Sequence, residues 1–89
     1  MMDIVAMHKD KKAQAEFARK AMQVYEAHRA EWEAQYTGHI AAIEVDSGDF
    51  FIGPTLGKAN DLAYAKYPDK WLYFVRIGEP ERAIALRTW

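Results

Sequence analysis

Residues 39–53 read HIAAIEVDSGDFFIG, and this stretch decides the fold. Its first half places alternating side chains on the two faces of a predicted β-strand: Ile40, Ala42 and Glu44 on one face, Ala41, Ile43 and Val45 on the other. Asp-Ser-Gly-Asp at 46–49 favours a tight turn, and Phe-Phe-Ile at 50–52 returns as a second strand. The stretch therefore predicts a β-hairpin.

The same turn invites a second interpretation, because an aspartic protease also presents its catalytic carboxylate as Asp-Ser-Gly after a hydrophobic run. That chemistry needs two carboxylates that share one proton, so a chain this short would have to supply one from each subunit of a dimer. Asp49 stands where such enzymes have a small residue, and a helix rather than a strand precedes the hairpin. We interpret Asp46 as a turn residue, predict no catalytic residue, and keep an aspartic-type hydrolase as the third hypothesis.

Upstream of the hairpin, residues 10–36 predict one long helix without Pro or Gly. Asp10 is placed to cap its start and Gly38 to end it. Steps of three and four residues draw its apolar stripe: Phe17, Ala21, Val24, His28, Trp32 and Tyr36. At 1.5 Å per residue the helix runs about 40 Å, whereas the predicted strands span about 17–23 Å. We therefore expect the helix to extend beyond the sheet that it covers.

Downstream, GPTLGKANDLAYAKYPDK at 53–70 predicts a shorter helix that Thr55 caps and Pro68 ends. WLYFVRIG at 71–78 is apolar on both faces and predicts an interior strand, GEPER turns the chain, and AIALRTW adds a last strand. A right-handed crossover gives the strand order 2-1-3. The predicted class is α+β, a long N-terminal helix followed by a β-β-α-β(-β) unit, with one small mixed or antiparallel sheet and both helices on one face. Residues 1–9 are a predicted tail, and residues 10–89 a single domain.

Composition excludes several classes of protein. A chain of 89 residues is too short for two cores, and 12 Lys and Arg balance 13 Asp and Glu, which argues against a duplex-binding surface. Without cysteine there are no disulfides, thiolate nucleophiles or cysteine metal sites. The start, MMDIVAMHKDKK, has its apolar residues before its charges, unlike a signal peptide, and no apolar run is long enough to span a membrane. We predict a cytoplasmic protein.

Two patterns suggest ligand sites but are better explained by structure. GPTLGKA at 53–59 resembles a P-loop, yet it has three residues between its glycines instead of four, and Ala59 stands where Ser or Thr would hold magnesium. His28 and Glu31 form a His-x-x-Glu pair, but a dinuclear site needs further ligands on facing helices. We predict no metal and no cofactor. We expect the hairpin carboxylates to be solvated charges: Glu44, Asp46 and Asp49.

About half of the chain, from WEAQY at 32–36 to Gly78, resembles a family of short uncharacterised bacterial proteins. The shared pattern is carried by Tyr36-Thr37-Gly38, Gly53-Pro54-Thr55-Leu56, Tyr67-Pro68-Asp69-Lys70 and Arg76-Ile77-Gly78. The resemblance implies a helix, hairpin, helix and strand, with no catalytic residues to transfer. A hairpin followed by Gly-x-Thr at the start of a helix is also similar to the small antitoxins of toxin–antitoxin pairs.

Excess apolar surface predicts a protein interface. With both helices on one face, the other sheet face and the first turns of the long helix lack cover, and monomers rarely expose such large apolar patches. A two-fold partner would bury both. The candidate interface is Phe17, Ala21, Trp71, Tyr73 and Trp89. The leading hypothesis is thus a small non-enzymatic protein-binding or regulatory module that acts as a homodimer, with itself and another protein as partners and no membrane.

The alternative is an antitoxin-like or nucleic-acid-binding regulator. Aromatic side chains exposed on a sheet can stack bases, and nearby positive charge can contact phosphates. The candidate anion or nucleic-acid patch is Arg76, Arg82 and Arg87, beside Tyr73, Phe74 and Trp89. No spacing typical of a nucleic-acid recognition motif accompanies them, and the net charge is −1.

Overall fold

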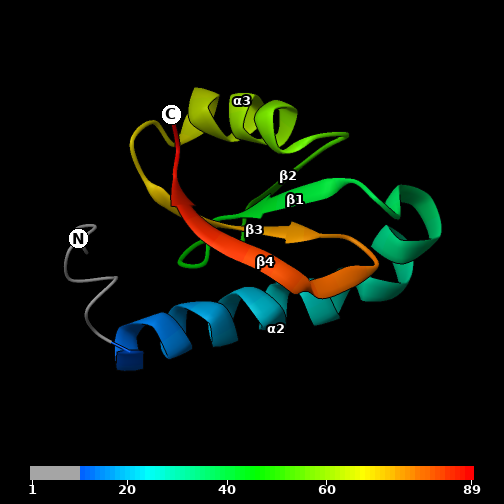
Figure 1. Ribbon diagram of the computed structural model, residues 1–89, viewed down its shortest axis with the longest axis horizontal. Helices are drawn as coiled ribbons and strands as arrows, with labels where there is room; N and C mark the ends of the chain where they lie inside the picture. Colours follow the sequence, from blue (N-terminus) through cyan, green and yellow to red (C-terminus); the bar gives the residue numbers. More distant parts are fainter. Residues whose placement is uncertain (1–10) are drawn as a thin grey trace.

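The computed structural model describes residues 11–89, which form two helices and one four-stranded sheet (Figure 1). The elements follow in the order α2 (Lys11–Tyr36), β1 (Ile40–Ile43), β2 (Phe50–Gly53), α3 (Leu56–Lys66), β3 (Trp71–Arg76) and β4 (Glu79–Arg87). This order confirms the predicted α+β class. The predicted tail at 1–9 and the Asp10 cap lie outside the described residues.

The sheet has the order β2-β1-β3-β4, and every neighbouring pair is antiparallel. β1 lies between β2 and β3, and Ile43 lies opposite Phe50 on one side and Tyr73 on the other. The predicted order 2-1-3 is therefore confirmed, and so is the interior position of β3. The last strand is also present, but it begins earlier than predicted. The turn is limited to Ile77 and Gly78, and Glu79 and Pro80 already belong to β4.

The two helices lie on opposite faces of the sheet, so the expectation that both cover one face is wrong (Figure 1). Side chains alternate along β1, and both of its series are apolar. One series packs with Tyr25 and Trp32 of α2, and the other packs with Ala59 and Ala63 of α3. A strand that is buried on both sides needs cover on both sides, and here each helix supplies one layer.

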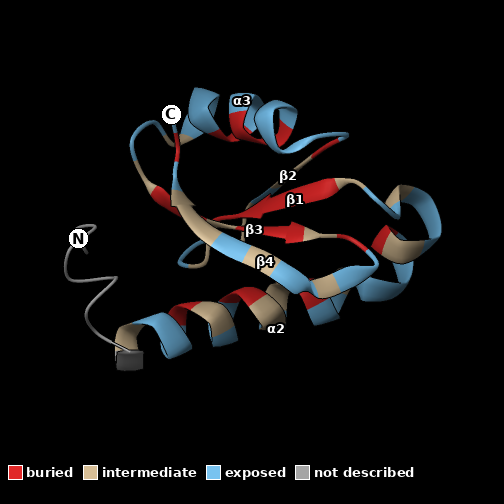
Figure 2. Cartoon of the chain, viewed as in Figure 1, coloured by how far each residue is buried: buried red, intermediate tan, exposed pale blue. Residues whose placement is uncertain are grey.

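The long helix α2 fits its face of the sheet because it contacts all four strands from end to end. Near its start, the Phe17 ring lies 5.8 Å from that of Tyr73 and packs with Trp71 and Ala85. Near its end, the Trp32 ring lies 4.8 Å from that of Phe50. The buried positions of α2 form a stripe facing the sheet in Figure 2. The expectation that its first turns lack cover is therefore wrong.

The shorter helix α3 is fixed at both ends as the sequence predicts. The Thr55 hydroxyl accepts a hydrogen bond from the backbone N–H of Lys58 (3.2 Å), which caps the start of the helix. Tyr67 is the C-cap, and Pro68 follows it. The end of β2 approaches the helix closely, since a Cβ added to Gly53 would lie 2.6 Å from the backbone nitrogen of Ala59. Gly53 therefore lets the second layer pack against the sheet.

Gly48 has a positive φ of 80° in the hairpin, as the predicted turn requires. A β-branched residue is strained in this conformation, although the space around Gly48 is open. We expect Gly48→Val to lower the free energy of unfolding by about 1–2 kcal/mol in urea denaturation, whereas Gly48→Asn, which tolerates a left-handed backbone, costs less. An unchanged stability for the Val variant would contradict the assigned strain.

Candidate functional site

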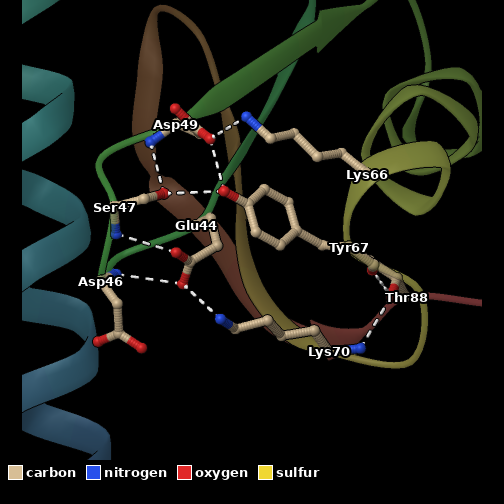
Figure 3. A network of polar contacts seen from close by, with 8 residues as sticks. All are labelled: Glu44, Asp46, Ser47, Asp49, Lys66, Tyr67, Lys70 and Thr88. Carbon is tan, nitrogen blue, oxygen red and sulfur yellow. Dashed lines mark hydrogen bonds and ion pairs between the residues drawn. The ribbon is translucent and has the colours of Figure 1, made fainter.

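The hairpin turn places Asp46 on the surface, as the sequence predicts. Residues 45–47 form the turn, and the backbone N–H of Asp46 donates to Glu44 Oε2 (3.1 Å). In Figure 3 the Asp46 carboxylate points away from the carboxylates of Glu44 and Asp49. A pair of carboxylates that share a proton must lie about 3 Å apart. Asp46 does not form such a pair with either of these neighbours.

Glu44 is the unexpected member of the hairpin, because its side chain is only 2% exposed. The expectation that it is a solvated charge is wrong. One carboxylate oxygen accepts the backbone N–H of Ser47 (2.9 Å), and the other accepts that of Asp46 and lies 3.5 Å from Lys70 Nζ (Figure 3). The carboxylate therefore does for the turn what a side-chain cap does for a helix terminus, since it satisfies backbone donors.

These contacts also set the ionisation of Glu44. Burial acts to raise its pKa, but hydrogen bonds from Ser47 and from the backbone of Asp46, together with the charge of Lys70, hold the pKa below its ordinary value. Glu44 is therefore ionised at neutral pH. An ionised carboxylate whose oxygens already accept hydrogen bonds holds a loop in place and is a poor proton donor.

Asp49, at the other end of the turn, joins the hairpin to α3. Its Oδ2 accepts hydrogen bonds from Lys66 Nζ (2.8 Å) and from the Tyr67 hydroxyl (2.5 Å), and its backbone N–H donates to Ser47 Oγ (3.1 Å). The hydrogen bonds from Lys66 and Tyr67 are the main causes that lower the pKa of Asp49. Asp49 remains partly exposed, and its carboxylate is paired with Lys66 and Tyr67.

A cleft of about 440 Å³ lies beside this network, between α2 and the segment before β3. Its walls include the rings of Phe17 and Trp71, the buried Glu44 and the partly exposed Lys70 that faces it. Three of its carboxylates have cationic partners within the chain: Glu44 with Lys70, Glu16 with Arg19 and Asp69 with Arg87. These three carboxylates are thus engaged within the chain, and the open volume of the cleft is bounded mainly by apolar surface.

Asp46→Asn tests whether the hairpin carboxylate has a catalytic role. Asn serves a turn as well as Asp, and no ion pair of Asp46 would be lost among the described residues. We expect the free energy of unfolding to change by less than about 0.5 kcal/mol. We also expect no change in a peptide-cleavage assay at acid pH. Peptide cleavage by the wild type that disappears in the Asn variant would instead identify Asp46 as catalytic.

His28 packs against other rings, and the P-loop-like segment begins a helix. The His28 ring stacks on Trp32 at a centroid distance of 5.1 Å and lies 4.8 Å from Phe50. Thr55, in the P-loop-like segment, caps α3. Within residues 11–89, no three His, Asp or Glu side chains are grouped as metal ligands. Neither helix in that range is both long and apolar enough to cross a membrane.

Four of the five candidate interface residues are packed within the chain itself. Ala21 is fully buried, Phe17 and Trp71 pack against each other, and Tyr73 lies beside them. Their surface is covered because α2 lies on the sheet face that was expected to be bare. Only Trp89 is exposed, at 58%, with its ring 6.1 Å from that of Phe74.

The three candidate arginines do not form one patch. Arg76 and Arg82 belong to the end of the sheet near the β3–β4 turn, whereas Arg87 lies opposite Trp71 at the other end. Each guanidinium also has a partner within the chain: the carbonyl of Gly38 for Arg76, Glu79 for Arg82 and Asp69 for Arg87. The structure thus gives this set no shared anion site.

The feature that the sequence did not predict is the free edge of β4. Within residues 11–89, β4 pairs with β3 on one side only and forms one edge of the sheet. The backbone N–H of Thr88 donates to the carbonyl of Lys70 (2.9 Å) in the same register as the β3–β4 ladder. Because backbone groups alternate along a strand, the N–H and C=O groups of Ala83, Ala85 and Arg87 point away from β3. We call this outward side of residues 83–87 the β4 edge.

Apolar side chains accompany the β4 edge. Ile84, in its middle, is 53% exposed, and Trp89 follows just beyond it. In Figure 2, β4 is drawn as exposed and intermediate, whereas β1 is mostly buried. α3 lies over β1 and β2, so it leaves this side of β4 uncovered. The edge is revealed by the position of β4 at the end of the sheet, which local sequence does not show.

Comparisons with protein-family models, with curated proteins and with solved structures find no match for this chain.

Proposed function

We propose that this protein is a small non-enzymatic binding module that acts as a homodimer through the β4 edge. The observation that carries the proposal is the free edge itself, whose backbone donors and acceptors at Ala83, Ala85 and Arg87 face no other strand among the described residues. Such an edge is a template for another strand, and proteins that stay monomeric usually shorten, bend or cover it. Here no described element covers the regular part of the edge, which carries the exposed Ile84.

The chemistry of the cleft supports a binding role over catalysis. Its buried carboxylate, Glu44, is ionised and held by two backbone N–H groups and by Lys70. A general acid or base needs a pKa near the working pH and a free path to its substrate. Glu44 has neither, because its hydrogen bonds lower its pKa and point its oxygens into the hairpin.

A matched pair of variants tests the proposal by light scattering. Ile84 on the β4 edge and Leu62 on α3 are almost equally exposed, at 53% and 51%. We expect the wild type to have twice the 10.2 kDa chain mass at micromolar concentration, Ile84→Asp to be monomeric, and Leu62→Asp to remain dimeric. A dimer that survives Ile84→Asp and dissociates with Leu62→Asp would place the interface on α3 instead.

The alternative, a nucleic-acid-binding regulator, has a distinct signature. Phosphate contacts release counterions, so such binding weakens steeply as salt rises. Because Arg76, Arg82 and Arg87 are separated and engaged within the chain, we expect no salt-dependent shift of a labelled oligonucleotide. A shift that Arg82→Ala and Arg87→Ala both weaken would favour the regulator over the binding module.

A further inference from the structure

We infer that two copies of this chain pair antiparallel along the β4 edge about a two-fold axis at Ala85, which joins their sheets into one. This inference rests on the proposed homodimer and adds its register. Ala85 would face the partner copy's Ala85, and Ala83 would face the partner copy's Arg87. Each of the three residues with outward backbone groups then has a partner, so the regular part of the edge is self-complementary.

The side chains fit this register on both faces. On the face that carries Ile84, this exposed residue would lie opposite the partner copy's Leu86, which is itself partly exposed. Directly opposed apolar side chains are the pairs that stabilise a sheet. On the α2 face, Ala85 would face its own copy and the small Ala83 would face the partner copy's Arg87, so no two large side chains oppose each other.

The irregular start of β4 limits how far the pairing extends. The ladder shifts register between Val75 and Arg76, so that Ala83 faces Val75 but Glu79 faces Arg76. Such a bulge bends a strand and ends regular pairing, and Pro80 lacks a backbone donor. Moving the axis by one residue to Ile84 would bring Glu81, inside this irregular segment, opposite Arg87. The axis at Ala85 instead uses only residues of the regular ladder.

Single cysteines test the register because the chain has none of its own. Residues in a hydrogen-bonded antiparallel pair have Cα atoms about 5.5 Å apart, within disulfide range. We expect Ala85→Cys to shift to a disulfide-linked dimer on mild oxidation, as seen on a non-reducing gel. Ala83→Cys, on the same face, would lie four residues out of step with its own copy, about 13 Å away, and should stay unlinked.

The outcomes separate the register from the dimer. A wild type that is monomeric by light scattering, with no link in Ala85→Cys, overturns the proposed homodimer and the register together. A dimeric wild type in which Ile84→Cys links and Ala85→Cys does not moves the axis by one residue and overturns the register alone. A dimer in which Ala83→Cys links as fast as Ala85→Cys, or in which none of these cysteines links, also overturns the register.

Discussion

Replacing Glu44 with Ala is expected to lower the free energy of unfolding by about 3 kcal/mol, measured by urea denaturation. The change leaves the backbone N–H groups of Asp46 and Ser47 without their acceptor and removes the carboxylate that Lys70 faces. Each unsatisfied donor costs about 1–3 kcal/mol, and Lys70 adds less because it is partly exposed. For a domain of this size, whose total stability is roughly 4–13 kcal/mol, the loss is a large fraction.

The Glu44 contribution also depends on pH, in a direction that follows from its pKa. The folded-state pKa is lowered from 4.5, the ordinary value that applies to the unfolded chain. The contribution is therefore fully present above that value and is lost as pH falls through the folded pKa. Glu44→Gln keeps one acceptor oxygen and cannot ionise. We therefore expect its free energy of unfolding to fall less steeply than that of the wild type as the pH drops below 4.5. Wild-type and Gln profiles of equal slope below pH 4.5 would contradict the assigned pKa shift.

Gly53→Ala is the second large effect, again about 3 kcal/mol by urea denaturation. The new Cβ would lie 2.6 Å from the backbone nitrogen of Ala59 and 2.9 Å from the carbonyl carbon of Lys58. Both contacts are with backbone, so the clash is relieved only if α3 shifts away from β2. That shift would loosen Ala59 and Ala63 from the sheet.

Gly57→Ala is the matched control for this clash. Gly57 lies in α3, close to the same junction, and a Cβ there would meet nothing within 4 Å. Since Ala favours a helix over Gly, we expect this variant to gain about 0.5–1 kcal/mol. If Gly53→Ala were as stable as the wild type, the close packing of α3 on β2 would be wrong.

Local patterns were enough to predict the elements and the order of the strands. Each of these patterns involves only a few neighbouring residues, and each is present in the structure. They are the alternation along 40–45, the Thr55 cap and the strand at 71–76 that is apolar on both faces. The placement of α2 was missed because it depends on which sheet face remains bare after α3 has packed. Its stripe also includes Tyr25, a fully buried residue whose hydroxyl donates to Glu33 (2.6 Å) and accepts from Gly78 N (3.0 Å).

The candidate site was harder to predict because its residues are joined by tertiary contacts. Glu44 appears in the sequence as one of three hairpin acids, and only the approach of Lys70 and the turn N–H groups distinguishes it. The β4 edge depends on strand order, since the same residues 83–87 would be an ordinary buried ladder in an interior strand. The predicted order 2-1-3 did not include β4, whose place depends on which side of β3 remains free.

The most direct test of whether the dimer forms through the β4 edge is to compare the wild type with Ala85→Pro by sedimentation equilibrium. The N–H of Ala85 points away from β3, so proline there removes a donor from the edge and leaves the β3–β4 hydrogen bonds in place. We expect twice the 10.2 kDa chain mass for the wild type and a folded 10.2 kDa monomer, checked by circular dichroism, for the variant. A wild type that sediments as a single 10.2 kDa species throughout the micromolar range would contradict the proposed dimer.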